Sequence, residues 1–110
     1  MAATDWPRIL RLYDRLLEVS PSPVIELNRA VALAEVEGPA AALTVVDRLA
    51  LECSHVFHAI RADLLTRLGR NRDAEKAYDE AIARAGNTRE RKFLMRSRDA
   101  LAQVLKSEAP

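Results

Sequence analysis

Apolar residues recur every three to four positions along most of the chain, which is the spacing of a helix that buries one face. Between residues 5 and 19 they follow i, i+3, i+4, i+7, i+8 spacing, at Ile9, Leu12, Tyr13, Leu16 and Leu17. No strand-length run alternates β-branched and polar residues. The pattern therefore predicts an all-α protein.

Capping residues and helix breakers divide this pattern into about six helices. Asp5, Ser22 and Ser54 are good N-caps, whereas Gly69 and Gly86 suit helix ends. The expected helices cover residues 5–19, 23–37, 39–51, 54–68, 71–85 and 88–105. Short connections force neighbouring helices to run antiparallel. We therefore expect a row of antiparallel helical hairpins.

The chain contains an internal repeat. A shift of 32 residues superimposes the second and third expected helices on the fourth and fifth, with Arg29-Ala30 on Arg61-Ala62. Small residues would let the helices approach closely and larger ones would fill the gaps between them, as in tetratricopeptide repeats. The second copy is the better match and departs from the family at His58, Arg61 and Gly86. The repeat-packing positions are Ala30, Leu33, Ala42, Val46, Ala62, Leu65, Ala74, Tyr78 and Ala81.

This repeat predicts one tetratricopeptide-like domain over residues 1–110 that winds into a right-handed superhelix. Residues 5–21 would be a half repeat, 23–51 and 54–86 whole repeats, and 88–106 a capping helix. The partner of the half repeat would precede residue 1, so we expect a fragment of a longer protein that could dimerise through this end in isolation. A simple capping helix fits residues 5–21 equally well.

Composition narrows the function only slightly. The net charge is +1, with −3 on residues 1–54 and +4 on residues 55–110, so the whole chain shows no strong bias toward nucleic acid. The sequence contains no apolar run of 18 residues, the length that would predict a membrane-spanning helix. Its first residues also lack the pattern of a signal peptide. The single Cys53 fits a reducing compartment. We expect a cytoplasmic protein without a membrane partner.

Candidate catalytic and metal-binding residues are few. Cys53, His55 and His58 cluster at a helix start, but zinc needs three or four ligands, and a hydrolase needs a nucleophile, a base and an orienting group. Nothing elsewhere obviously completes either set, and the glycines are too scattered to cradle a phosphate. The prediction is no enzyme, no metal and no cofactor.

Two surfaces are candidates for binding. The first helix of each repeat should line a mostly apolar concave face that suits an amphipathic helix or an adjacent domain, formed by Val24, Leu27, Val31, Val56, Ala59 and Asp63. The last helix is basic and could neutralise phosphates, through Arg89, Arg91, Lys92, Arg96 and Arg98. The alternative for this helix is a solvated outer face. Its inner face would then be Phe93, Leu94, Ser97, Leu101, Val104 and Leu105.

Four stretches resemble the C-terminal tetratricopeptide-like domain of one group of extracytoplasmic-function sigma factors of RNA polymerase. They are DWPRILRLYD, SPSPVIELNRAVALAEVEGP, HVFHAIRADLLTRLGR and AYDEAIARAGNTRERKFL, and the resemblance covers roughly Asp5 to Leu101. SPSPVIELNRAVA and GNTRERKFL are the most specific parts. The match is weaker at residues 54–58, where family members usually have an aromatic residue before the histidines.

The resemblance implies a regulatory interaction domain of a bacterial transcription initiation factor. Its partners would be the upstream sigma-factor domains and RNA polymerase or a regulator protein, and the missing upstream domains would contact the DNA. Two alternatives stay open on the residues themselves. One is a free-standing tetratricopeptide adaptor that binds a peptide or helix, and the other is an accessory nucleic-acid contact through the basic last helix.

Overall fold

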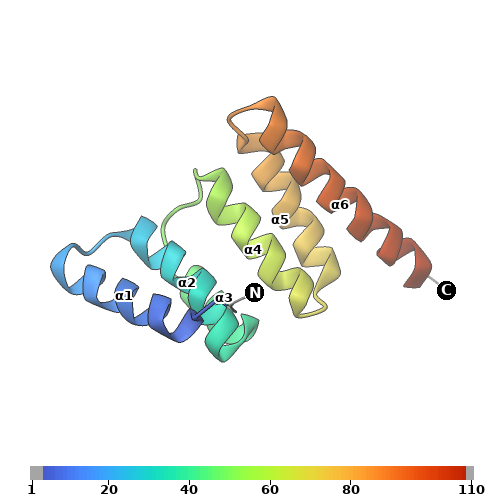
Figure 1. Cartoon of the computed structure of the whole chain (residues 1–110). Helices are drawn as coiled ribbons and strands as arrows, with labels where there is room; N and C mark the ends of the chain where they lie inside the picture. The colour runs from blue at the N-terminus through green and yellow to red at the C-terminus, as the bar shows by residue number, and fades with distance from the viewer. Residues whose placement is uncertain (1–3, 109–110) are drawn as a thin grey trace. The chain divides into compact units, whose positions relative to one another are not determined.

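A computed structural model describes residues 4–108, and over this range it contains six helices and no strand. The helices are α1 (Trp6–Val19), α2 (Pro23–Glu37), α3 (Pro39–Val46), α4 (His55–Arg67), α5 (Asn71–Arg84) and α6 (Thr88–Glu108) (Figure 1). The all-α fold expected from the hydrophobic period is confirmed.

The chain divides into two compact units, residues 1–51 and 52–110. In the first unit α1 packs on α2 and α2 packs on α3, and in the second α4 packs on α5 and α5 on α6. Consecutive helices within each unit thus form the expected hairpins. The structure defines the packing of helices within each unit. The single domain over residues 1–110 and the right-handed superhelix across both units therefore remain predictions.

The N-caps stand where the sequence predicts them. The side chain of Asp5 accepts the backbone N–H of Arg8 at 3.2 Å, and Ser54 accepts that of Phe57 at 3.4 Å. Ser22 does the same for Ile25, and Pro23 follows it in the first turn of α2. Each cap satisfies one backbone donor that the helix itself leaves unpaired.

The third helix is shorter than predicted, because it ends at Val46 rather than near Leu51. Beyond Asp47 the chain tightens, and the N–H groups of Arg48 and Leu49 donate to the carbonyls three residues back. Bonds of this kind close a 3₁₀ turn and do not extend an α-helix. Leu49 remains buried in this turn.

The turn between α4 and α5 is a Schellman motif. Gly69 has φ +76°, its N–H donates to Thr66 O, and the N–H of Arg70 donates to Leu65 O at 2.9 Å. This geometry satisfies the last carbonyls of α4 and requires a residue that tolerates positive φ.

All nine repeat-packing positions are buried. Seven of them have no measurable solvent exposure, and the other two, Leu33 and Tyr78, are less than a tenth exposed. The alanines stand on both helices of each repeat, where a larger side chain would hold the backbones apart. The seven positions without measurable solvent exposure are Ala30, Ala42, Val46, Ala62, Leu65, Ala74 and Ala81.

Candidate interaction surfaces

Helix α1 is strongly amphipathic, yet none of its residues is buried. Its apolar side chains divide into two groups. Trp6, Ile9, Leu10, Tyr13 and Leu17 are half-buried, whereas Leu12, Leu16 and Val19 are 54%, 44% and 84% exposed. We call these last three the open face of α1. An apolar row of this kind is typical of a surface that binds another protein.

The other side of α1 is fixed to α2 by a charged contact. The guanidinium of Arg29 lies 2.5 Å from Asp14, and both side chains are partly exposed. A partly exposed pair contributes little stability. The pair nevertheless identifies the side of α1 that faces α2, because Asp14 lies on that side.

The six residues predicted for the concave face do not all lie on a surface. Leu27 is only 3% exposed and belongs to the core of its unit, so its assignment to a binding surface is wrong. Val24 and Val31 are exposed on α2. On α4, Val56 and Asp63 are exposed and Ala59 is half-buried. The apolar spacing of α2 could not predict that Leu27 is buried while Val24 and Val31 are exposed, because all three positions fit one face of the helix.

The basic residues of α6 separate into two groups. Arg98 donates to Asp79 on α5 at 3.0 Å and also pairs with Asp99, and the hydrogen bond to Asp79 raises its pKa. It therefore belongs to the contact between α5 and α6. The remaining four are exposed, and within residues 4–108 no ion pair of their side chains is recorded; they are Arg89, Arg91, Lys92 and Arg96.

The inner face of α6 is also narrower than predicted. Leu94 and Leu101 are buried, and Ser97 and Leu105 are half-buried. Phe93 and Val104 are 65% and 45% exposed, so their assignment to the inner face is wrong. They lie one position from Leu94 and Leu105, and the main packing of α6 in this unit is against α5, which covers a narrow stripe.

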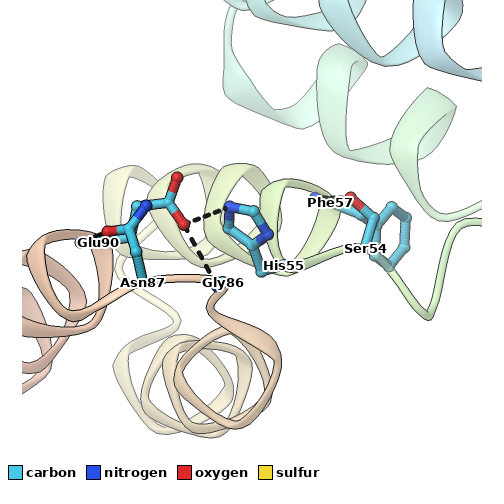
Figure 2. A network of polar contacts seen from close by, with 6 residues as sticks. All are labelled: Ser54, His55, Phe57, Gly86, Asn87 and Glu90. Carbon is cyan, nitrogen blue, oxygen red and sulfur yellow. Dashed lines mark hydrogen bonds and ion pairs between the residues drawn. The ribbon is translucent and has the colours of Figure 1, made fainter.

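A polar network ties the start of α6 to α4 (Figure 2). Asn87 accepts the backbone N–H of Glu90 at 2.9 Å, and the carboxylate of Glu90 accepts the backbone N–H of Gly86 at 3.3 Å. This exchange is a variant of the capping box. The same carboxylate lies 3.1 Å from His55 Nε2, so Glu90 joins the two helix starts.

The three residues considered for a metal or a nucleophile do not converge. The ring of His58 is buried, shares a hydrogen bond of 2.7 Å with Glu52 O and packs edge-on against Phe57. His55 instead contacts Glu90, and Cys53 is exposed. Across residues 4–108 no three His, Cys, Asp or Glu side chains gather closely enough to hold a metal ion.

Tyr78 is a buried ionisable group of the second unit. Burial raises the pKa of its phenol above 10.0, and the nearby Asp63 carboxylate acts in the same direction. Hydrogen bonds with Thr66 and Ser97 oppose this shift of the pKa. Tyr78 on α5 thus interacts with both neighbouring helices, α4 and α6.

Across the described residues, no helix has both the length and the hydropathy that a bilayer crossing requires. The described residues form an all-α protein of helical hairpins with exposed apolar and basic helix faces.

Comparison with known proteins finds a relative of this chain. The chain is 46% identical over 101 residues to an uncharacterized protein of Rhizobium meliloti (strain 1021). The match covers 90% of this chain and 24% of that protein, so the chain spans about a quarter of the length of the relative. No protein-family model matches the chain, and no solved structure matches it.

Proposed function

We propose that this chain is a protein–protein interaction domain of a bacterial sigma factor, which acts in transcription initiation by binding and not by catalysis. The domain would hold or present the promoter-binding domains and contact RNA polymerase or a regulator protein. The cytoplasm, where transcription takes place in bacteria, is the compartment that this proposal requires.

The observation that carries the interaction role is the open face of α1. A helix whose apolar residues Leu12, Leu16 and Val19 are exposed, beside hairpins whose packing alanines are buried, suits a module that binds a further protein element. The sigma-factor assignment is supported by the four sequence stretches described above. The greater length of the R. meliloti relative is compatible with a domain of a larger protein.

A binding experiment with defined proteins tests the proposal. Residues 1–110 would be mixed with purified core RNA polymerase, and separately with the two purified promoter-binding domains of a sigma factor of this group. We expect a complex with at least one of them in sedimentation velocity. A Leu12→Asp variant changes an exposed residue of the open face of α1 and should weaken it. No complex with either protein would exclude the proposal.

The basic side of α6 supports a second candidate, an accessory contact with nucleic acid. Arg89, Lys92 and Arg96 are exposed at i, i+3 and i+7, so they share one side of the helix. A mobility-shift assay with plain duplex DNA should then show binding that weakens steeply with salt. A triple change of these residues to Gln should abolish the shift, and no shift at low salt would exclude this candidate.

A further inference from the structure

Helices α1 and α5 occupy equivalent positions in their units. A shift of 65 residues places Trp6–Val19 on Asn71–Arg84, end to end, and places Tyr13 on Tyr78 and Asp14 on Asp79. Asp14 binds Arg29 on the helix that follows α1, and Asp79 binds Arg98 on the helix that follows α5. The side of α1 that faces α2 therefore corresponds to the side of α5 that faces α6.

The two helices differ in how many neighbours they have. α5 packs between α4 and α6, whereas the neighbour against which α1 packs is α2. Leu12 and Leu16 correspond to Ala77 and Ala81, which are 2% and 0% exposed on α5. On α1 the same positions are about half exposed, and they carry larger side chains. The part of the open face formed by Leu12 and Leu16 thus corresponds to a face of α5 that is buried in the second unit, where α4 precedes α5 and packs on it.

A row of arginines borders this open face. Arg8, Arg11 and Arg15 follow i, i+3, i+7 spacing and are exposed, and within residues 4–108 no ion pair of their side chains is recorded. Of the acidic residues nearby, Asp14 is paired with Arg29 and Asp5 caps the helix. Glu18 remains beside the row, which leaves this edge with a net charge of +2.

We propose that the open face of α1 binds one amphipathic helix from outside residues 1–110, antiparallel to α1, with acidic residues along the flank that meets Arg8, Arg11 and Arg15. This helix would lie on α1 as α4 lies on α5. Charge complementarity selects its acidic flank. The match covers 24% of the R. meliloti relative, so that protein contains much additional sequence.

The charges disfavour a second copy of the chain as the occupant. A two-fold interface brings the same patch of both subunits together. The arginine rows of two antiparallel α1 helices would then meet, and like charges at an interface oppose association. Each chain would have to bury this net positive edge against its own equivalent.

Two helical peptides of about 16 residues provide the test, a length near the minimum for a stable helix. Both carry Leu and Ala at i, i+3, i+4 and i+7, and their remaining exposed positions are all Glu in one and all Lys in the other. Fluorescence anisotropy with residues 1–110 at about 50 mM salt should show the Glu peptide binding at least about tenfold more tightly. The difference should shrink at about 0.5 M salt.

Variants of the chain separate the apolar and charged contributions. Val19→Asp and Leu16→Asp should abolish binding of both peptides, and Val19 is too exposed for its change to disturb the fold. Changing Arg8, Arg11 and Arg15 to Glu should reverse the preference toward the Lys peptide. Arg72→Glu, a single charge reversal of the same kind at an exposed site on α5, should have no effect.

Three outcomes would overturn this inference. They are equal binding of both peptides, no binding of either, and a dimer in sedimentation equilibrium that Val19→Asp dissolves and that excludes the peptides. The last would identify a second copy as the occupant. The inference does not rest on the sigma-factor proposal, since the peptides contain no sigma-factor sequence, and each experiment can fail while the other succeeds.

Discussion

Ala62 on α4 and Ala74 on α5 are both fully buried, one on each helix of the same hairpin. Thirty-two residues earlier, Ala30 on α2 and Ala42 on α3 are buried in the same way. A methyl group at each of these places lets two helix backbones approach closely, and the larger residues beside them fill the remaining volume. Each of the two hairpins is therefore sensitive to side-chain size at two predictable positions.

Enlarging either alanine of the second hairpin should destabilise the protein. Ala62→Leu and Ala74→Leu would each overpack the contact between α4 and α5, at a cost of about 1–3 kcal/mol. For a domain of this size each kcal/mol lowers the melting temperature by about 4–8 °C. Arg72→Leu on the exposed side of α5 is the control and should change the thermal melt little. Equal shifts in all three variants would contradict the repeat packing.

Gly69→Ala should destabilise the turn between α4 and α5 through the backbone alone. Gly69 has φ +76°, and a Cβ there would meet nothing within 4 Å, so no side-chain clash adds to the effect. Forcing a residue with a Cβ into this conformation costs about 1–2 kcal/mol. Gly86→Ala is the matched control, because φ of Gly86 is not positive and its added Cβ would make an ordinary contact with Glu90. Urea denaturation of both variants should show a loss only at Gly69.

Most of the fold could be predicted because local signals mark nearly every helix end. Asp5, Ser22 and Ser54 cap the helices that follow them, and Gly69 terminates α4. The end of α3 has no such signal. Residues 47–51 contain neither glycine nor proline, and they stop the helix through a 3₁₀ turn that buries Leu49. Tertiary packing decides that boundary, and a one-dimensional pattern cannot contain it.

The candidate surfaces were harder to predict, because a helical period gives a face but not what covers it. Leu27 and Val24 fit the same face of α2, yet one is buried and the other exposed. Likewise, Arg98 is close in sequence to Arg96 but pairs with Asp79 on another helix. The open face of α1 could be anticipated from its apolar spacing. The net positive charge of its arginine border could not be anticipated, because it depends on Asp14 lying on the side of α1 that faces α2, against Arg29.

Removing the carboxylate of Glu90 should weaken the start of α6. Glu90→Ala would leave the N–H of Gly86 and the ring of His55 without their shared acceptor, while Asn87 would keep its bond to the backbone of residue 90 (Figure 2). Losses of helix caps cost about 0.5–2 kcal/mol. Hydrogen exchange should show faster exchange in the first turn of α6. Lys92→Ala, an exposed change in the next turn, should leave those amides unaltered, and equal exchange in both variants would contradict the role of Glu90.

Tyr78 should make the second unit less stable at alkaline pH. Burial raises the pKa of its phenol in the folded protein above the ordinary value of 10.0. Below about pH 10 the phenol is protonated in both states, so it adds no pH dependence. Above that value the unfolded chain loses the proton first, which favours unfolding. The stability should therefore fall with rising pH until the folded phenol also ionises.

Tyr78→Phe isolates this contribution from the other groups that titrate in the same range. The variant loses the hydrogen bonds with Thr66 and Ser97, so it should be less stable at neutral pH by about 1 kcal/mol. Its stability should then decline less steeply than that of the unchanged protein between about pH 9 and pH 11. Guanidinium denaturation at each pH gives both curves. Curves that stay parallel over the whole range would mean that the phenol titrates alike in the folded and unfolded chains, which contradicts its burial between α4 and α6.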